Sequence, residues 1–213
     1  MIKTIIFDFD GVIAESVDVK ADGFAMLYEP YGKNVVNQVL AHHYANGGVS
    51  RYEKFRHYHK AFLGSNLNKN DLKELGSRFS EFVVRRIIKA PYVKGALKFI
   101  MENYNKINFF ISTGTPQNEI EIILKERGIS HYFIEIYGSP QSKIDHITNI
   151  INKHNLNKKE IIFIGDSITD KNAANQTGIP FVARIKDNKD VLLNEHRKIE
   201  DFSDLRQIFS GMT

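Results

Sequence analysis

Five short runs of nearly continuous apolar residues place the strongest constraint on how this chain of 213 residues can fold. The runs are Ile2–Phe9, Ile107–Ser112, Tyr132–Tyr137, Ile161–Gly165 and Phe181–Ile185. Most are rich in Ile and Phe, which is typical of strands buried on both faces of a parallel sheet. Segments with helical periodicity separate the later runs, as the crossovers of a parallel sheet require. The sequence therefore predicts an α/β fold with a parallel sheet.

The segment after the second run has the clearest helix signals. Thr115 can cap a helix, Pro116 suits the first helical position, and Gly128 can end the helix. An apolar stripe of Ile120, Ile123 and Leu124 lies between them. A final helix is predicted near Ser203–Phe209.

The long interval between the first and second runs contains no convincing strand. Amphipathic helices are predicted near Val17–Tyr31, Val35–Ala45, Ser50–Leu63 and Lys69–Lys89. Four helices with apolar faces can form a small bundle. We therefore expect an α/β core of residues 1–14 and 89–213, with a helical domain of residues 15–88 inserted between its first two strands.

Composition excludes several classes of site. The absence of cysteine excludes disulfides, cysteine-ligated metals and a cysteine nucleophile. No apolar run is long enough to span a bilayer, and the N-terminus lacks the apolar core of a signal peptide, so we expect a cytoplasmic protein. The net charge is +4, but the basic residues are scattered rather than gathered in a stripe. We therefore expect no nucleic-acid or membrane partner.

Two acids follow the first apolar run in Asp8-Phe9-Asp10-Gly11. On an extended chain, residues two apart point the same way, and Asp8 and Asp10 would lie roughly 6.6 Å apart along the strand. Acids at the end of a buried strand are costly unless a cation or hydrogen-bond donors compensate. A simple Asp-Gly turn is the competing interpretation.

Polar residues also follow later strands. Ser112-Thr113-Gly114 ends the second run just before a helix, where backbone N–H groups can bind an anion. Asp166 and Asp170 follow the fourth run, and either could instead be a helix cap or a surface acid. Lys143 opens the helix after the third run, where a lysine is unfavourable to the helix dipole. An anionic partner would explain it, and a solvated lysine is the competing interpretation. Ligands of open α/β sheets bind at this edge, so we predict one site there.

These motifs resemble those of the haloacid-dehalogenase-like (HAD) superfamily, in its phosphatase branch. The resemblance rests on Asp8-Phe9-Asp10-Gly11-Val12, Ser112-Thr113-Gly114, Lys143 and Gly165-Asp166-Ser167 with Asp170, in that order along the chain. It implies a Rossmann-like core of five parallel strands in the order 3-2-1-4-5. It also implies a helical cap inserted after the first motif, which is similar to the insertion predicted above.

The resemblance implies a role for each motif residue. Asp8 would be the nucleophile that forms an aspartyl-phosphate, and Asp10 the general acid and base. Ser112 would bind the phosphoryl oxygens together with the backbone of Thr113 and Gly114.

The two remaining motifs would complete the charge of the site. Lys143 would pair with the phosphate and with Asp8. Mg²⁺ would be held by Asp8, the Asp10 carbonyl and Asp166, with Asp170 in support.

The expected function is therefore magnesium-dependent hydrolysis of a small phosphorylated metabolite, such as a sugar phosphate or a phosphoglycolate-like acid. Asp10 argues against a dehalogenase, because a halide leaving group needs no proton. A phosphosugar mutase shares all the motifs and stays open, as does a non-catalytic binding or regulatory protein. A phosphonate hydrolase would need a cap lysine in an apolar segment that lowers its pKa, and the sequence shows no evident one.

Two residues of the predicted cap are candidates for contact with the leaving group. Arg51 and Lys54 follow the glycine turn Gly47-Gly48 and lie one helical turn apart, so both can point the same way. A solvated basic helix face is the competing interpretation.

Overall fold

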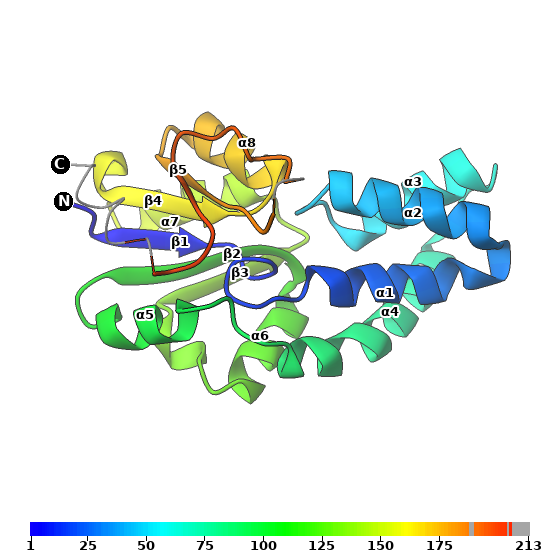
Figure 1. The fold of residues 1–213 in the computed structure, drawn as a ribbon, viewed down its shortest axis with the longest axis horizontal. Coiled ribbons are helices and arrows are strands. Elements are labelled where there is room, and N and C mark those ends of the chain that lie inside the picture. The colour runs from blue at the N-terminus through cyan, green and yellow to red at the C-terminus, as the bar shows by residue number, and fades with distance from the viewer. Residues whose placement is uncertain (188–189, 204, 206–213) are drawn as a thin grey trace.

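Among the described residues, six parallel strands form one sheet at the centre of the protein (Figure 1). The computed structural model describes residues 1–187, 190–203 and 205. The strands are β1 (Thr4–Phe7), β2 (Asn108–Pro116), β3 (Glu135–Ser139), β4 (Ile161–Gly165), β5 (Phe181–Arg184) and β6 (Lys198–Ile199). Their order is β3-β2-β1-β4-β5-β6, which confirms the α/β Rossmann-like class and the predicted order of the first five.

The expectation of only five strands was wrong. The sixth strand, β6, has two residues and pairs with β5 through Ala183 and Arg184. Two residues carry no periodicity that could distinguish a strand from a loop. The helix predicted near Ser203–Phe209 extends over residue 204 and residues 206–209, which lie outside the described part of the chain.

Helices cover both faces of the sheet, and this explains the nearly continuous apolar runs (Figure 1). They are α5 (Ala96–Asn103) and α6 (Gln117–Glu126) on one face, and α7 (Lys143–Lys153) and α8 (Ile168–Thr177) on the other. Along β1, Ile5 and Phe7 join the cluster that contains α5 and α6, whereas Ile6 joins the cluster of α7 and α8. Each side chain of the strand is therefore buried, whichever face it occupies.

Of the five α-helices between β1 and β2 in the described residues, α5 packs on the sheet. The four helices that precede it were predicted, and they extend beyond the carboxyl end of the sheet (Figure 1). They are α1 (Val17–Tyr28), α2 (Lys33–Ala45), α3 (Arg51–Phe62) and α4 (Lys69–Lys89). Their buried interior is strongly aromatic, with Phe24, Tyr28, Phe55, Tyr58 and Phe79. No helix of the described residues has both the length and the apolar character to cross a membrane.

Short 3₁₀ turns connect several of these elements. They are η1 (Glu29–Tyr31), η2 (Ser130–Tyr132) and η3 (Lys158–Glu160). The helix predicted to reach Tyr31 ends at Tyr28, because Pro30 lies in the first turn of η1. A proline lacks the N–H that would continue the α-helix.

The end of β2 differs from the sequence prediction. The strand continues through Thr115 to Pro116, and α6 begins only at Gln117, without a side-chain cap. The hydroxyl of Thr115 donates instead to the carboxylate of Asp10, 2.9 Å away. A threonine hydroxyl can cap a helix, but that of Thr115 bonds to the distant carboxylate of Asp10 instead. Thr115 is therefore part of the site.

The sheet core yields a stability prediction. Phe163 of β4 is fully buried and lies edge-on to Phe181. Phe163→Ala should lower the free energy of unfolding by about 3–5 kcal/mol, because it removes apolar contacts and leaves a cavity. Urea unfolding would measure the loss. Ile122→Ala, at a half-exposed position of α6, is the matched control and should change stability by less than about 0.5 kcal/mol; equal losses would contradict the packing described here.

Candidate active site

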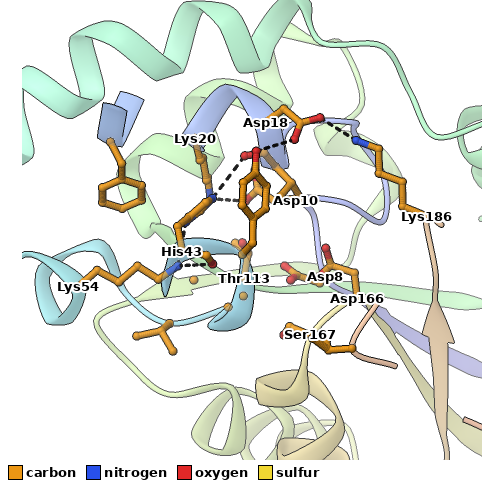
Figure 2. Close-up of a pocket in the computed structure, with 18 of the residues that line it drawn as sticks. Asp8, Asp10, Asp18, Lys20, His43, Lys54, Thr113, Asp166, Ser167 and Lys186 are labelled. Atoms are coloured by element: carbon orange, nitrogen blue, oxygen red, sulfur yellow. Dashed lines mark hydrogen bonds and ion pairs between the residues drawn. The ribbon is translucent and has the colours of Figure 1, made fainter. Parts of the chain in front are cut away.

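A cavity of about 490 Å³ lies between the carboxyl end of the sheet and the helical insertion (Figure 2). The sheet side contributes Asp8, Asp10, Thr113, Gly114 and Asp166, and the insertion contributes residues of α1, α2, α3 and the Gly47-Gly48 loop. Parallel strands end at the same edge of a sheet, which brings segments far apart in the sequence together. The volume is that of a site for a small molecule.

Asp8 follows β1 and forms an ion pair with Lys143. The Lys143 ammonium donates to Asp8 Oδ2 at 2.7 Å, and the backbone N–H of Phe9 donates to Oδ1 at 2.6 Å. Burial raises the pKa of Asp8 to about 6, and the charges of Asp170 and Asp10 add to this, against the opposing effect of Lys143. The ion pair predicted for Lys143 and Asp8 is therefore present.

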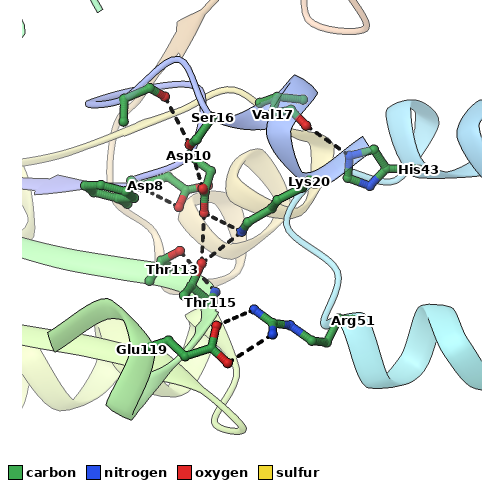
Figure 3. Close-up of polar contacts among 12 residues, drawn as sticks. Asp8, Asp10, Ser16, Val17, Lys20, His43, Arg51, Thr113, Thr115 and Glu119 are labelled. Atoms are coloured by element: carbon green, nitrogen blue, oxygen red, sulfur yellow. Dashed lines mark hydrogen bonds and ion pairs between the residues drawn. The ribbon is translucent and has the colours of Figure 1, made fainter. Parts of the chain in front are cut away.

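Asp10 accepts hydrogen bonds from three side chains (Figure 3). Ser16 donates to Oδ1 at 2.6 Å, and Lys20 and Thr115 donate to Oδ2 at 2.5 and 2.9 Å. Burial alone would raise the pKa of Asp10, but Lys20 and the hydroxyl donors outweigh it, so the pKa is lowered. Asp10 is therefore an ionised carboxylate with a fixed orientation.

Three carboxylates form the acidic part of the site. Asp8, Asp166 and Asp170 each place one oxygen within 4.8 Å of the others. Asp170 is fully buried, accepts from Lys143 at 2.5 Å and from the Ser167 hydroxyl at 2.5 Å, and closes the capping box of α8. Burial, together with the charges of Asp8 and Asp170, raises the pKa of Asp166 well above its usual range.

The charges of this cluster fit a divalent cation. Three carboxylates and the Lys143 ammonium leave two negative charges when all four groups are ionised. Carboxylate oxygens are the ligands that Mg²⁺ prefers. Asp10 does not share in the cluster through its side chain, whose oxygens are occupied by Ser16, Lys20 and Thr115.

The prediction that Ser112 binds the phosphoryl group is contradicted. Ser112 is fully buried and its hydroxyl lies 3.0 Å from His146 Nδ1, on the α7 side of the sheet. Thr113 lines the cavity instead. Successive side chains of a strand point to opposite faces, so only one of two adjacent hydroxyls can enter the site. Thr113 Oγ1 accepts a hydrogen bond from the Thr115 N–H, so the hydroxyl proton of Thr113 can be donated to a ligand.

The glycine loop of the insertion lies directly over the sheet edge. Gly47 accepts a hydrogen bond from Thr169 at the start of α8, and Gly48 has φ +74°, a conformation that glycine adopts readily. A Cβ at Gly114 would lie only 2.7 Å from the carbonyl oxygen of Gly48. The close approach of these two backbones therefore requires glycine at position 114.

Arg51 lines the cavity but is neutralised by the α/β core. Its guanidinium forms two hydrogen bonds with Glu119 of α6, at 2.7 and 3.0 Å (Figure 3). A third hydrogen bond joins it to Ser80 of α4. Only 5% of the Arg51 side chain and 10% of the Glu119 side chain are exposed. Arg51 is thus not part of a solvated basic face, and its charge is already paired.

Lys54 lies one turn further along α3, on the cavity wall. It is 3% exposed, and its ammonium contacts His43 Nδ1 at 3.0 Å and the His43 carbonyl at 3.3 Å. Burial and the charge of Lys20 lower the pKa of Lys54 to about 7, while Asp166 opposes the shift. The expectation that no lysine of the insertion occupies a pKa-lowering environment was therefore wrong, because packing of α1 and α2 creates that environment.

The three side chains that hold Asp10, namely Ser16, Lys20 and Thr115, were not predicted from the sequence. Lys20 had a detectable signal, because it shares the apolar face of α1 with Phe24 and Leu27 at helical spacing. A lysine on such a face needs an anionic partner. Thr115 had no such signal, since its residue type fits a helix cap equally well.

Fold and site together define a hydrolase with an acid pair at the end of its first strand, and the comparisons with known proteins agree. Residues 5–184 match the family described as haloacid dehalogenase-like hydrolase, and the chain belongs to this family. It is 24% identical over 185 residues to a phosphoglycolate phosphatase of Vibrio parahaemolyticus, covering 83% of this chain and 81% of that protein.

Solved structures show the same fold. A predicted phosphoglycolate phosphatase from Haemophilus somnus has a TM-score of 0.75 at 19% identity, covering 98% of both chains. A β-phosphoglucomutase from Clostridium difficile has a TM-score of 0.76 at 18% identity, covering 99% of this chain and 98% of that one. The similarity to both structures therefore extends over nearly all of this chain, including its helical insertion.

The Arg51–Glu119 ion pair yields a second stability prediction. Glu119→Ala should lower the free energy of unfolding by about 3–5 kcal/mol, because it leaves the buried Arg51 charge without a partner. The double variant Arg51→Met, Glu119→Leu should recover most of this loss, since it removes both charges. Urea unfolding of the three proteins would measure the effect. A double variant no more stable than Glu119→Ala would show that the charge is not the cause.

Proposed function

We propose that this haloacid dehalogenase-like phosphatase hydrolyses a small phosphomonoester through a covalent intermediate on Asp8, with Mg²⁺ as the cofactor. The observation that carries the proposal is the pairing of Asp8 with Lys143 beside a second carboxylate, Asp10, whose orientation is fixed by three donors. The two acids are close but held differently, which suits two different roles.

Asp8 is the nucleophile in this proposal. A carboxylate oxygen attacks phosphorus, and the bond from phosphorus to the leaving oxygen breaks. Lys143 holds the attacking carboxylate in place and offsets the negative charge that accumulates as the phosphoryl group approaches. Thr113 and the backbone N–H of Gly114, both at the cavity, donate to the phosphoryl oxygens.

Asp10 transfers the proton. Substrate brings negative charge beside Asp10, which raises its pKa and favours the protonated form that the leaving oxygen needs. After the alcohol departs, ionised Asp10 accepts a proton from the water that attacks the aspartyl-phosphate. Lys20 and Thr115 keep the carboxylate aimed during both steps.

Asp8, Asp166 and Asp170 are the side chains proposed to hold Mg²⁺, together with the backbone carbonyl of Asp10. The proximity of their carboxylates and the raised pKa of Asp166 support this assignment. The cation supplies charge neutralisation between the phosphate and these acids.

In this proposal residues 15–88 act as the cap that covers the site, and residues 1–14 and 89–213 as the catalytic core. The loop at Gly47-Gly48 and the Arg51–Glu119 ion pair join the two across the cavity. A cap held this closely leaves room for a small ester rather than a folded protein. Phosphoglycolate, which names the relatives' activity, is a substrate of suitable size.

A phosphosugar mutase would use the same residues, and the structural similarity to a β-phosphoglucomutase keeps it the second candidate. The two functions differ in whether water reaches the aspartyl-phosphate. Release of inorganic phosphate supports the phosphatase, whereas an isomerised phosphosugar without phosphate release supports the mutase.

The nucleophile assignment predicts that Asp8→Asn lowers phosphate release by at least about a thousandfold while the fold persists. The assay would follow phosphate from phosphoglycolate, sugar phosphates, nucleotides and an aryl phosphate, with Mg²⁺ and with a chelator. Asp22→Asn, on the exposed face of α1, is the control and should keep wild-type activity. Activity retained in Asp8→Asn would contradict the assignment.

The metal assignment predicts opposite effects of Asp166→Asn with and without Mg²⁺. In metal-free protein the variant should have a higher Tm than wild type, because it relieves repulsion among three buried acids. Added Mg²⁺ should raise the Tm of wild type and of Asp22→Asn. The Tm of Asp166→Asn should rise much less, because this variant lacks one of the metal ligands. Thermal unfolding over a Mg²⁺ titration measures both. An unchanged Mg²⁺ response in Asp166→Asn would remove it as a ligand.

A further inference from the structure

We propose that Lys54 binds a carboxylate on the leaving group of the substrate, so that the enzyme selects small phosphomonoesters carrying this second anionic group. This inference rests on the proposed phosphatase function and adds the feature that distinguishes one substrate from another. It assigns Lys54 rather than Arg51 to substrate recognition.

The first observation is the state of the cations that the insertion presents to the cavity. Lys20 pairs with Asp10 at 2.5 Å, and Arg51 pairs with Glu119 at 2.7 Å. Lys54 lines the same cavity and forms no ion pair with any acid of the described residues. Among the described residues, it is thus the cation of this wall that forms no ion pair, although Asp166 acts on it from a greater distance.

The second observation is that Lys54 is held in place. Of its three N–H donors, two are taken by His43 Nδ1 and the His43 carbonyl. His43 Nε2 lies 3.5 Å from the Val17 carbonyl, an acceptor, so Nε2 carries the proton and Nδ1 accepts from Lys54. One donor and one positive charge remain for a ligand. Figure 2 shows Lys54 beside His43 at the cavity.

The surroundings of Lys54 strengthen any interaction with an anion. The ammonium lies 5.7 Å from the Phe24 ring centroid, and the residue is almost fully buried. Burial lowers the pKa of His43 to about 3, with Lys54 adding to the shift, so His43 is neutral and Lys54 supplies the positive charge of this pair. Lys54 carries one positive charge in a poorly solvated wall, where the attraction of opposite charges is strong. A carboxylate carries one negative charge and would balance it.

The position of Lys54 separates it from the proposed phosphoryl site. Asp8, Thr113 and Lys143 all belong to the sheet side, where Lys143 already supplies a cation to the nucleophile. Lys54 belongs to α3 of the insertion, which covers the cavity from the opposite side. A substrate held between the two walls would direct its phosphoryl group to Asp8 and the far end of its leaving group to Lys54.

The test compares two substrates that differ only at that far end. 2-Phosphoglycolate carries a carboxylate, and 2-hydroxyethyl phosphate has a neutral alcohol in its place. For the full-length enzyme with Mg²⁺, kcat/KM should be at least about tenfold higher for 2-phosphoglycolate, as expected for one buried charge pair. Lys54→Met should abolish this preference and change kcat/KM for 2-hydroxyethyl phosphate by less than about threefold. Lys60→Met, on an exposed position of the same helix, should keep the preference.

The opposite results would overturn the proposal. An unchanged preference in Lys54→Met would show that another group reads the carboxylate. An equal loss on both substrates would place Lys54 at the phosphoryl group or in a purely structural role. A Lys54 adduct trapped by borohydride with phosphonoacetaldehyde would make Lys54 a nucleophilic amine rather than an anion receptor.

Binding measured without turnover separates this inference from the proposed function. On the Asp8→Asn background, adding Lys54→Met should weaken binding of 2-phosphoglycolate by about tenfold or more in calorimetry. If wild type releases no phosphate from either substrate, the proposed function fails, and this binding comparison still decides the role of Lys54. Equal affinity of the single and double variants would overturn it.

Stability supplies a readout that a structural role would not give. A buried ammonium without a counter-charge costs folding free energy, so Lys54→Met should raise the Tm by about 2–4 °C even as it loses the carboxylate preference. A lower Tm would show that Lys54 stabilises the fold and would count against the proposal.

The pH dependence of KM has a defined sign. Lys20 from α1, His43 from α2 and Asp166 after β4 are the titratable groups that act on Lys54. Free Lys54 loses its proton above about pH 7, whereas carboxylate binding requires the ammonium. The KM of wild type for 2-phosphoglycolate should therefore rise between pH 7 and pH 9, and that of Lys54→Met should stay flat. A flat wild-type profile would contradict the assignment.

Discussion

The arrangement of the site depends on two ion pairs, in which Lys143 binds Asp8 and Asp170. Three buried or half-buried carboxylates within 4.8 Å would repel one another strongly without a cation between them. Burial disfavours the Lys143 ammonium, but Asp170 and Asp8 outweigh it and raise its pKa. β1, β4 and the start of α7 can therefore meet at one point, and the remaining negative charge is of the kind that a divalent cation can offset.

The carboxyl end of a parallel sheet explains why much of the site could be predicted from the sequence. Buried strands are recognisable as apolar runs, and polar residues that follow such runs must share one edge. Asp8, Asp10 and Asp166 were found in this way. Lys143 was a candidate because a cation at a helix start is unfavourable to the helix dipole, and an anionic partner would explain it. The structure provides Asp8 and Asp170 as partners. In each case a charged residue at a position where its charge is unfavourable indicated that a group of opposite charge would lie nearby in the fold.

The features that could not be predicted depend on which face of the sheet each strand residue occupies, or on packing between distant segments. Ser112 and Thr113 are adjacent hydroxyl residues, and a shift of one residue exchanges which of them faces the cavity. The two residues of β6 carry no pattern at all. Glu119, the partner of Arg51, lies 68 positions away on a different element. Nothing in the sequence of α3 indicates that Arg51 would meet this carboxylate, or that Lys54 would form no ion pair with an acid of the described residues.

Arg51 and Lys54 show how one helix can serve two purposes with similar residues. The planar guanidinium of Arg51 suits a bidentate bond with Glu119, which joins the insertion to the core and leaves no charge for a ligand. The ammonium of Lys54 has a single charge, a lowered pKa and a neutral histidine beside it. A protein that buries such a cation loses stability, and selection for stability alone would favour an apolar side chain there. A substrate carboxylate that pairs with Lys54, as proposed, would explain why a lysine occupies this position of the cavity wall.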